Sequence, residues 1–118
     1  MMNHWLNKFR FAFQGIASGV RGQSSFKVHV PATILVVILA VALNCSTVQW
    51  CILGLCVALV WIAELFNSSI ELLARGLCSQ QNADVGKALD VAAGAVLVAS
   101  IFAAAVGGSI FFVQLWGS

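Results

Sequence analysis

From Val28 to Ala63 the chain reads VHVPATILVVILAVALNCSTVQWCILGLCVALVWIA, a run of 36 residues (28–63) without a single charged side chain. A second charge-free run covers the 28 residues 91–118. A transmembrane helix needs about 20 consecutive apolar residues, so the second run can hold one span and the first can hold two. These runs predict an all-α integral membrane protein.

The composition excludes most soluble functions. Hydrophobic residues make up 61% of the 118 residues and charged residues only 8%. Soluble domains carry about 25% charged residues, so this chain has too few charges to cover a water-exposed surface. The deficit excludes a secreted disulfide module, a disordered chain, a nucleic-acid-binding domain and an ordinary cytosolic enzyme. The length allows one small domain, residues 1–118.

A polar cluster divides the first charge-free run. Asn44-Cys45-Ser46-Thr47 predicts a turn at residues 44–49, because it is the only polar cluster there. The expected transmembrane spans are therefore residues 28–43, 48–70 and 91–115.

The basic residues orient these spans. Four precede the first span and two lie between the second and the third: Lys8, Arg10, Arg21 and Lys27, then Arg75 and Lys87. The positive-inside rule then places the N-terminus and the second connection in the cytoplasm and the C-terminus outside. We therefore expect a multi-pass protein whose charged groups lie at the cytoplasmic interface.

Residues 1–25 carry an amphipathic pattern. Apolar side chains recur at helical spacing, with polar ones mostly elsewhere: Trp5, Phe9, Phe13, Ile16 and Val20 against Lys8, Gln14, Ser18 and Arg21. Such a helix lies in the headgroup region of a membrane. The alternative is an ordinary basic flank of the first span. The pattern favours the interfacial helix, which we expect to end before Gly22-Gln23-Ser24-Ser25.

Small residues dominate the third predicted span: Ala92, Ala93, Gly94, Ala95, Ala99, Ala103, Ala104, Ala105, Gly107 and Gly108. Small side chains let helix backbones approach closely in lipid. Because a three-span chain of this length has little interior of its own, we expect a homo-oligomer.

A polar stripe follows one face of the second predicted span and its extension. At 100° per residue, Asn67, Glu71 and Arg75 lie within about 60° of Glu64 around the helix. An ionisable group inside a span costs at least about 2 kcal/mol, which makes it a candidate functional group. An i,i+4 pair of Glu71 with Arg75 is the alternative, but it leaves Glu64 and Asn67 unexplained.

Two segments form motifs that can be compared with known proteins. Residues 64–71 read ELFNSSIE and residues 90–96 read DVAAGAV. They resemble the E-x-x-N-[ST]-[AS]-I-E and K-D-x-A-A-G-A-V blocks of the small bacterial diacylglycerol and undecaprenol kinases. Residues 10–16 (RFAFQGI) and 26–29 (FKVH) are similar to that family's R-F-x-x-A-x-x-G-I and N-F-[RK]-x-H patterns. The resemblance covers about residues 9–115.

The resemblance implies a fold and an activity. Family members are homotrimers of three-span subunits with an N-terminal surface helix, in the bacterial inner (cytoplasmic) membrane. They transfer the γ-phosphoryl group of ATP, with Mg²⁺, to the hydroxyl of a membrane lipid. By resemblance, the lipid is diacylglycerol or undecaprenol, and the ATP site faces the cytoplasm.

The resemblance also implies roles for individual residues. Glu64 is expected to be the general base, Glu71 a magnesium ligand, and Asn67 the residue that orients one of these carboxylates. Phe26 and Lys27 are expected to contact the lipid together with Glu64. The expected nucleotide contacts are Arg10, Arg75, Asn82, Lys87 and Asp90. A hard oxygen ligand suits Mg²⁺, and a carboxylate deeper in the membrane suits a base for a lipid hydroxyl.

Three positions depart from the family pattern. Gln23 replaces a second metal-binding glutamate, Arg75 replaces an aspartate, and Leu89 replaces the lysine of K-D. Arg75 or Lys87 would supply the cation missing at Leu89. The alternative function is a catalytically impaired family member that binds lipid or assists membrane assembly. A channel or transporter subunit is disfavoured, because nothing polar lines the outer half of any predicted span.

Overall fold

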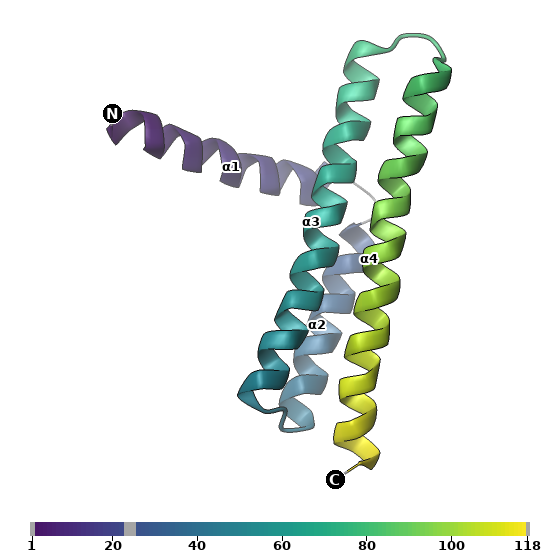
Figure 1. The fold of residues 1–118 in the computed structure, drawn as a ribbon. Helices are drawn as coiled ribbons and strands as arrows, with labels where there is room; N and C mark the ends of the chain where they lie inside the picture. The colour runs from purple at the N-terminus through teal and green to yellow at the C-terminus, as the bar shows by residue number, and fades with distance from the viewer. Residues whose placement is uncertain (1, 23–25, 118) are drawn as a thin grey trace.

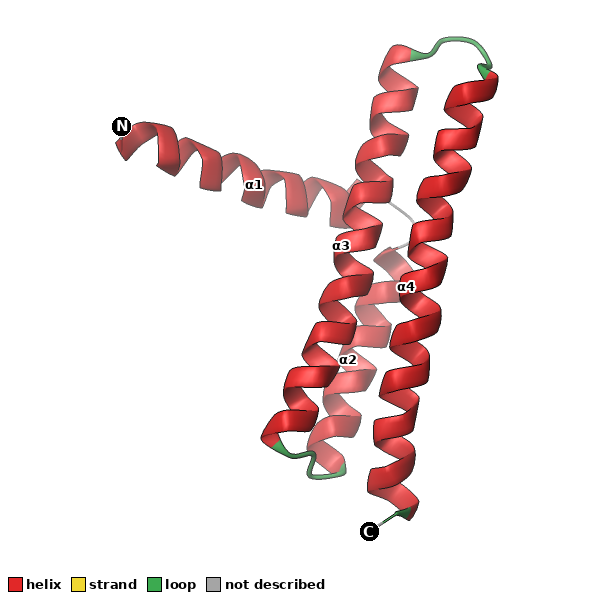
Figure 2. Ribbon diagram, viewed as in Figure 1, coloured by secondary structure: helices red, strands yellow, loops and turns green. Residues whose placement is uncertain are grey.

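The computed structural model describes residues 2–22 and 26–117, and every regular element in these ranges is an α-helix (Figures 1 and 2). The elements are α1 (Met2–Gly22), α2 (Phe26–Ala42), α3 (Thr47–Leu77) and α4 (Ala83–Trp116). The predicted all-α class is confirmed.

The helices form a hairpin with two additions. α3 and α4 run antiparallel and pack mainly on each other, and α2 lies beside them (Figure 1). α1 projects sideways, across the axis of the other three helices, and contacts α3. The α3–α4 hairpin continues past the level of α1, so its tip stands clear of the rest of the chain (Figure 1).

Two of the helices have the length and composition of membrane spans. Within the described residues, α3 and α4 qualify, whereas α2 is apolar but has 17 residues. At 1.5 Å per residue α2 rises about 25 Å, somewhat less than the hydrocarbon core of about 30 Å. The predicted count of three spans is therefore supported for two helices, and a crossing by α2 stays a prediction.

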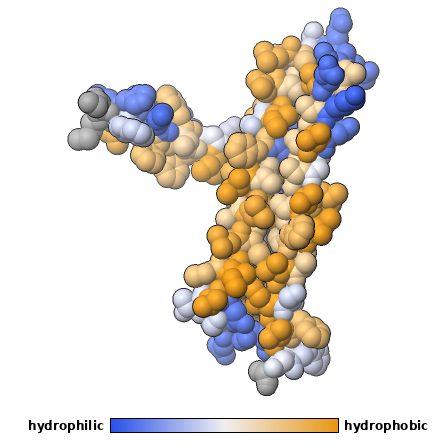
Figure 3. Space-filling model, viewed as in Figure 1, coloured by the Kyte–Doolittle hydropathy of each residue, from blue (hydrophilic) through white to orange (hydrophobic). Residues whose placement is uncertain are grey.

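The helices are longer than the predicted spans. α3 contains the expected span 48–70 but continues to Leu77, and α4 begins at Ala83, ahead of the expected span 91–115. A span is set by apolar length, but backbone hydrogen bonding continues a helix into water as well. The connection between the helices is therefore short, residues 78–82. In Figure 3, hydrophilic residues gather at the ends of the hairpin and hydrophobic ones cover most of the length between.

The α2–α3 turn is also shorter than predicted. Ser46 Oγ accepts a hydrogen bond from Gln49 N, and Gln49 Oε1 accepts one from Ser46 N, so the pair forms a capping box. Residues 47–49 are thus the first turn of α3 rather than loop. The polar cluster at residues 44–47 separates α2 from α3, as expected, and its last residue, Thr47, is the first residue of α3.

Polar side chains tie this turn to the end of α4. Gln114 Nε2 donates to the carbonyl oxygen of Leu43 at 2.8 Å, and Gln49 Nε2 donates to Gln114 Oε1 at 3.1 Å. These bonds join α2, α3 and α4 at the end that the charge pattern predicts to be extracytoplasmic.

Small residues of α4 pack against α3 of the same chain. Ala92, Ala99 and Gly107 are buried, and a Cβ added at Gly107 would lie 3.7 Å from Leu53 Cδ2. The small residues of α4 were expected to mediate contacts between subunits. Some of them instead form contacts within a single subunit. The homotrimer stays a prediction.

α1 exposes its aromatic side chains. Trp5, Phe9 and Phe13 are 57%, 61% and 69% exposed, and Lys8 Nζ lies 5.1 Å from the centroid of the Trp5 ring. An exposed apolar face on a helix lying across the bundle is the arrangement expected of an interfacial helix. Residues 23–25, where a break was predicted, lie outside the described residues.

Candidate active site

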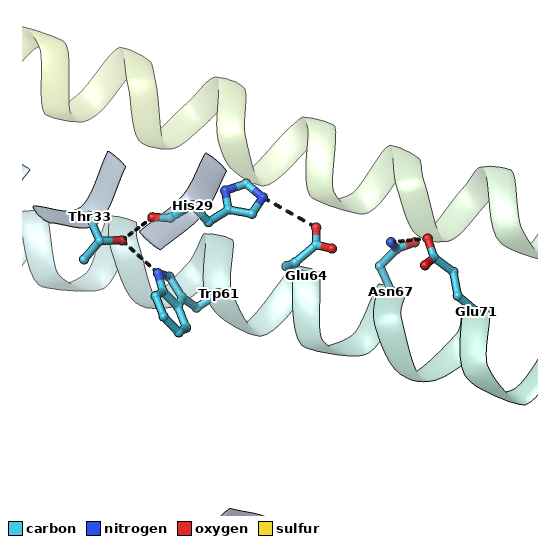
Figure 4. Close-up of polar contacts among 6 residues, drawn as sticks. All are labelled: His29, Thr33, Trp61, Glu64, Asn67 and Glu71. Atoms are coloured by element: carbon cyan, nitrogen blue, oxygen red, sulfur yellow. Dashed lines mark hydrogen bonds and ion pairs between the residues drawn. The ribbon is translucent and has the colours of Figure 1, made fainter. Parts of the chain in front are cut away.

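The polar stripe on α3 is buried at Glu64 and Asn67 and becomes exposed toward Arg75. Glu64, Asn67 and Ser68 are 2%, 6% and 2% exposed, and they are the buried polar side chains in the described part of the chain. Glu71, one turn further along, is half-buried. The structure therefore places the predicted Glu64, Asn67 and Glu71 on one face of one helix (Figure 4).

Glu64 faces a histidine from α2. His29 Nε2 lies 3.5 Å from Glu64 Oε2, and the two side chains are 16% and 2% exposed. In Figure 4 the imidazole ring points along α3 toward the carboxylate. His29 was not among the residues expected to act at the site, although the FKVH motif contains it. The feature of the sequence that could have drawn attention to His29 is its position, because it is a polar ring at the start of a run without charged residues.

An aromatic cluster holds the start of α2 against α3. Phe26 is 1% exposed, and its ring centroid lies 5.1 Å from that of Trp61 and 6.1 Å from that of His29. Trp61 Nε1 donates to Thr33 Oγ1 at 2.9 Å, and Thr33 Oγ1 donates to the His29 carbonyl at 2.8 Å. Phe26, expected to contact lipid, instead packs within the chain, whereas Lys27 is exposed.

Asn67 is bonded to Glu71. Asn67 Nδ2 donates to Glu71 Oε1 at 2.9 Å, so the amide is linked to the carboxylate nearer the hairpin tip and not to Glu64. Asn67 Oδ1 and Ser68 Oγ are buried and have no hydrogen-bond partner within the described ranges. Buried polar atoms are nearly always paired, so these two atoms stand out as buried groups without a partner on the face of α3 that carries both carboxylates.

An open pocket lies at the hairpin tip, between the end of α3 and the start of α4. Its volume is about 1020 Å³, and Glu71, Arg75, Asn82 and Leu89 are among its lining residues. The structure thus brings two predicted nucleotide contacts, Arg75 and Asn82, to the predicted metal ligand Glu71.

The other predicted nucleotide and metal residues are placed differently. Lys87 and Asp90 are exposed on α4 and do not line this pocket, and Arg10 is exposed on α1. Gln23 lies outside the described residues. The side chain of Asn82 also has a structural role, because its Oδ1 accepts from Asp84 N and Val85 N and caps α4.

An apolar groove runs between α2, α3 and α4. Its volume is about 320 Å³, and its lining includes His29, Thr33, Trp61, Ala104 and Gly107. This groove could not be predicted from the sequence, because its walls come from three segments far apart in the chain. His29 belongs both to the groove and to the contact with Glu64.

Comparison with known proteins places these features in a family. The family model for prokaryotic diacylglycerol kinase matches residues 10–111. A diacylglycerol kinase of Synechocystis sp. is 33% identical over 111 residues, which are 93% of this chain and 63% of that protein. This chain therefore spans less than two thirds of the Synechocystis relative's length.

Two further relatives are named for different lipid kinases. The undecaprenol kinase of Bacillus subtilis is 28% identical over 114 residues, 97% of this chain and 93% of that protein. A diacylglycerol kinase of Escherichia coli K12 is 29% identical over 93 residues, 79% of this chain and 76% of that protein. The resemblance expected from the ELFNSSIE and DVAAGAV motifs is confirmed: the chain belongs to the prokaryotic diacylglycerol kinase family.

Proposed function

We propose that this protein is an ATP-dependent lipid kinase that phosphorylates the hydroxyl of diacylglycerol or undecaprenol at the cytoplasmic membrane interface. One observation carries the proposal: a buried carboxylate, Glu64, and a half-buried carboxylate beside a wide, open pocket, Glu71, share one face of α3. The seven-residue separation corresponds to about 10 Å along the helix axis. A membrane-embedded acceptor and a water-borne donor can thus approach the same face from opposite ends.

The proposed reaction assigns a step to each group. Glu64 accepts the proton of the lipid hydroxyl, the hydroxyl oxygen attacks the γ-phosphorus of ATP, and ADP leaves. Phosphoryl transfer depends mainly on positioning and on neutralising charge, which suits a site with few reactive groups. Arg75 supplies a cation at the pocket. Asn67 Oδ1 and Ser68 Oγ, which lack a hydrogen-bond partner in the described part of the chain, lie between the two carboxylates in the sequence of α3.

The side chains near the pocket fit Mg²⁺, which prefers oxygen ligands. Glu71 Oε1 is held by Asn67, which leaves Oε2 as a ligand atom, and Asn67 Oδ1 is unpaired in the described part of the chain. No group of three His, Cys, Asp or Glu forms a metal site among the described residues. Glu71 would therefore hold the ion jointly with the nucleotide phosphates, whose charge Mg²⁺ neutralises when bound.

The shape of the chain supports a proposed position in the membrane. With α1 on the cytoplasmic surface, the bilayer covers α2 and the lower part of the α3–α4 hairpin, and the hairpin tip stands in the cytoplasm (Figure 1). We propose that α2 is the third span, that the C-terminus is extracytoplasmic, and that three copies form a homotrimer. The exposed apolar side chains along all three helices support contact with lipid or with further copies.

A direct assay tests the proposed function. Purified protein in mixed micelles is given γ-labelled ATP, Mg²⁺ and a panel of lipids, and label in extracted lipid is measured. Transfer to diacylglycerol or undecaprenol that depends on Mg²⁺ supports the proposal. Asp84→Asn is the matched control for carboxylate variants, because Asp84 is exposed and is not part of the stripe.

One observation favours the second candidate, a lipid-binding family member without kinase activity. Leu89 lines the pocket at the position where the resemblance leads to a lysine, so the pocket has one cation fewer. Lipid binding without transfer of label in the same assay would select this second function.

A further inference from the structure

The contact between α2 and Glu64 has a function of its own if Glu64 is the base. Glu64 is 2% exposed, and within the described ranges His29 is its sole ion-pair or hydrogen-bond partner. A buried carboxylate without a partner is costly, because it loses its hydration without compensation. Among the described residues, His29 is therefore the group placed to compensate the burial of Glu64.

The imidazole ring is itself held in place. Phe26 packs against it edge-on, and the Thr33 hydroxyl bonds its backbone carbonyl while accepting from Trp61. The bond from Trp61 joins α3 back to α2, so the ring is fixed relative to the helix that carries Glu64. A glutamate side chain has several rotatable bonds, and a fixed partner on another helix restricts them.

The geometry points to His29 as a positioning residue for Glu64, an inference that rests on the proposed kinase function. The ring engages Oε2 and leaves Oε1 to accept the proton of the lipid hydroxyl. Because His29 also lines the apolar groove, the restrained carboxylate lies next to the space from which a lipid would approach. His29 itself contacts neither the phosphoryl group nor the nucleotide in this scheme.

Two substitutions separate positioning from simple packing. His29→Leu removes the Nε2 group but keeps an apolar side chain, whereas His29→Gln keeps an N–H donor at a similar reach. We expect His29→Leu to lower kcat by about 10²-fold with the KM for ATP unchanged, as misplacement of a reacting group by about 1 Å does. His29→Gln should recover at least about tenfold of that loss. His4→Leu, in exposed α1, is the matched histidine control.

A second measurement does not depend on activity. Dicyclohexylcarbodiimide modifies carboxyl groups in membranes, and mass spectrometry of the peptide carrying Glu64 gives the rate of modification. We expect several-fold faster modification of Glu64 in His29→Leu, near wild-type rates in His29→Gln and His4→Leu, and none at position 64 in Glu64→Gln.

The outcomes distinguish the inference from the function on which it rests. An inactive wild-type protein whose Glu64 modification still responds to His29→Leu refutes the kinase function and retains the contact. Full activity and unchanged modification in His29→Leu overturn the positioning role. Equal losses in the leucine and glutamine variants do so as well, since they would show that only packing matters.

Discussion

Single residues at the hairpin tip determine how the proposed site binds its donor. Leu89 lines the pocket beside Arg75, and Glu71 brings a negative charge to the same wall. A nucleotide phosphate at this place meets one arginine of the described lining, so each added or removed cation should have a measurable effect.

Leu89→Lys should lower the KM for ATP by about three- to tenfold, because one more cation interacts with the phosphates in a partly solvated site. The measurement is lipid phosphorylation as a function of ATP concentration. Ala88→Lys adds the same charge next to the pocket lining and should leave the KM for ATP unchanged. If Arg75 already fills this role, Arg75→Ala should be less harmful in the Leu89→Lys background than in the parent. If neither Leu89→Lys nor Arg75→Ala changes the KM for ATP, this pocket does not bind the nucleotide.

Asn67→Ala should raise the Mg²⁺ concentration for half-maximal rate by about tenfold or more, because residues that orient metal ligands affect affinity to that extent. The variant loses the bond from Asn67 Nδ2 to Glu71 Oε1. Ser69→Ala is the control, since the Ser69 hydroxyl is exposed and bonds only its own helix. Equal Mg²⁺ requirements in the two variants would refute a metal role for Glu71.

The sequence was informative about residues that are neighbours on one helix. Glu64, Asn67 and Glu71 could be placed on one face because the helical period is fixed by local geometry. The contact between His29 and Glu64 could not be predicted, because it depends on how α2 packs against α3. The N-cap role of Asn82 was predictable in principle, because asparagine is a preferred residue before the first turn of a helix. The family resemblance instead led to the prediction that Asn82 contacts the nucleotide.

At the scale of the elements, helices and membrane spans have to be distinguished. The hydropathy pattern located the apolar parts of α3 and α4. It did not locate their polar ends, because a segment with charged residues is not recognised as part of a membrane span. The polar stripe extended the expected helix to Arg75, so the helical turns that were missed are mainly those at the start of α4, and Ala83, Val85, Gly86 and Leu89 of these turns line the proposed donor site. The turn at Ser46 was found because polar capping residues stand out in an apolar run.

The groove between α2, α3 and α4 should receive one chain of the lipid. Ala104→Leu narrows the groove and should lower kcat/KM for the lipid by about tenfold, the effect of a few methylene groups in an apolar pocket, with the KM for ATP unchanged. Ala105→Leu makes the same change at a neighbouring position outside the groove and should have little effect. If the two variants have the same lipid kinetics, the groove is not part of the lipid site.

At the scale of the whole molecule, the account depends on which end of the bundle faces the cytoplasm. Two native cysteines mark the two ends: Cys45 lies in the α2–α3 turn and Cys78 begins the α3–α4 connection. Single-cysteine variants that keep one or the other should react with an impermeant maleimide from opposite sides of sealed vesicles. We expect Cys78 to react from the cytoplasmic side only and Cys45 from outside only.

A reporter fused after Ser118 should be extracytoplasmic in the same experiment. Labelling of Cys45 from outside, together with a cytoplasmic N-terminus, would show that α2 crosses the membrane. Reaction of Cys78 from outside would reverse the orientation and separate the pocket from cellular ATP, which contradicts the proposed function.

The proposed role of Glu64 as the base of a lipid kinase can be tested by measuring transfer of label from γ-labelled ATP to lipid by the parent and by Glu64→Gln. We expect transfer by the parent and by Asp84→Asn. We also expect that Glu64→Gln lowers the rate by about 10²–10⁴-fold, the usual contribution of general base catalysis, with unchanged ATP binding. A Glu64→Gln variant as active as the parent would contradict this role.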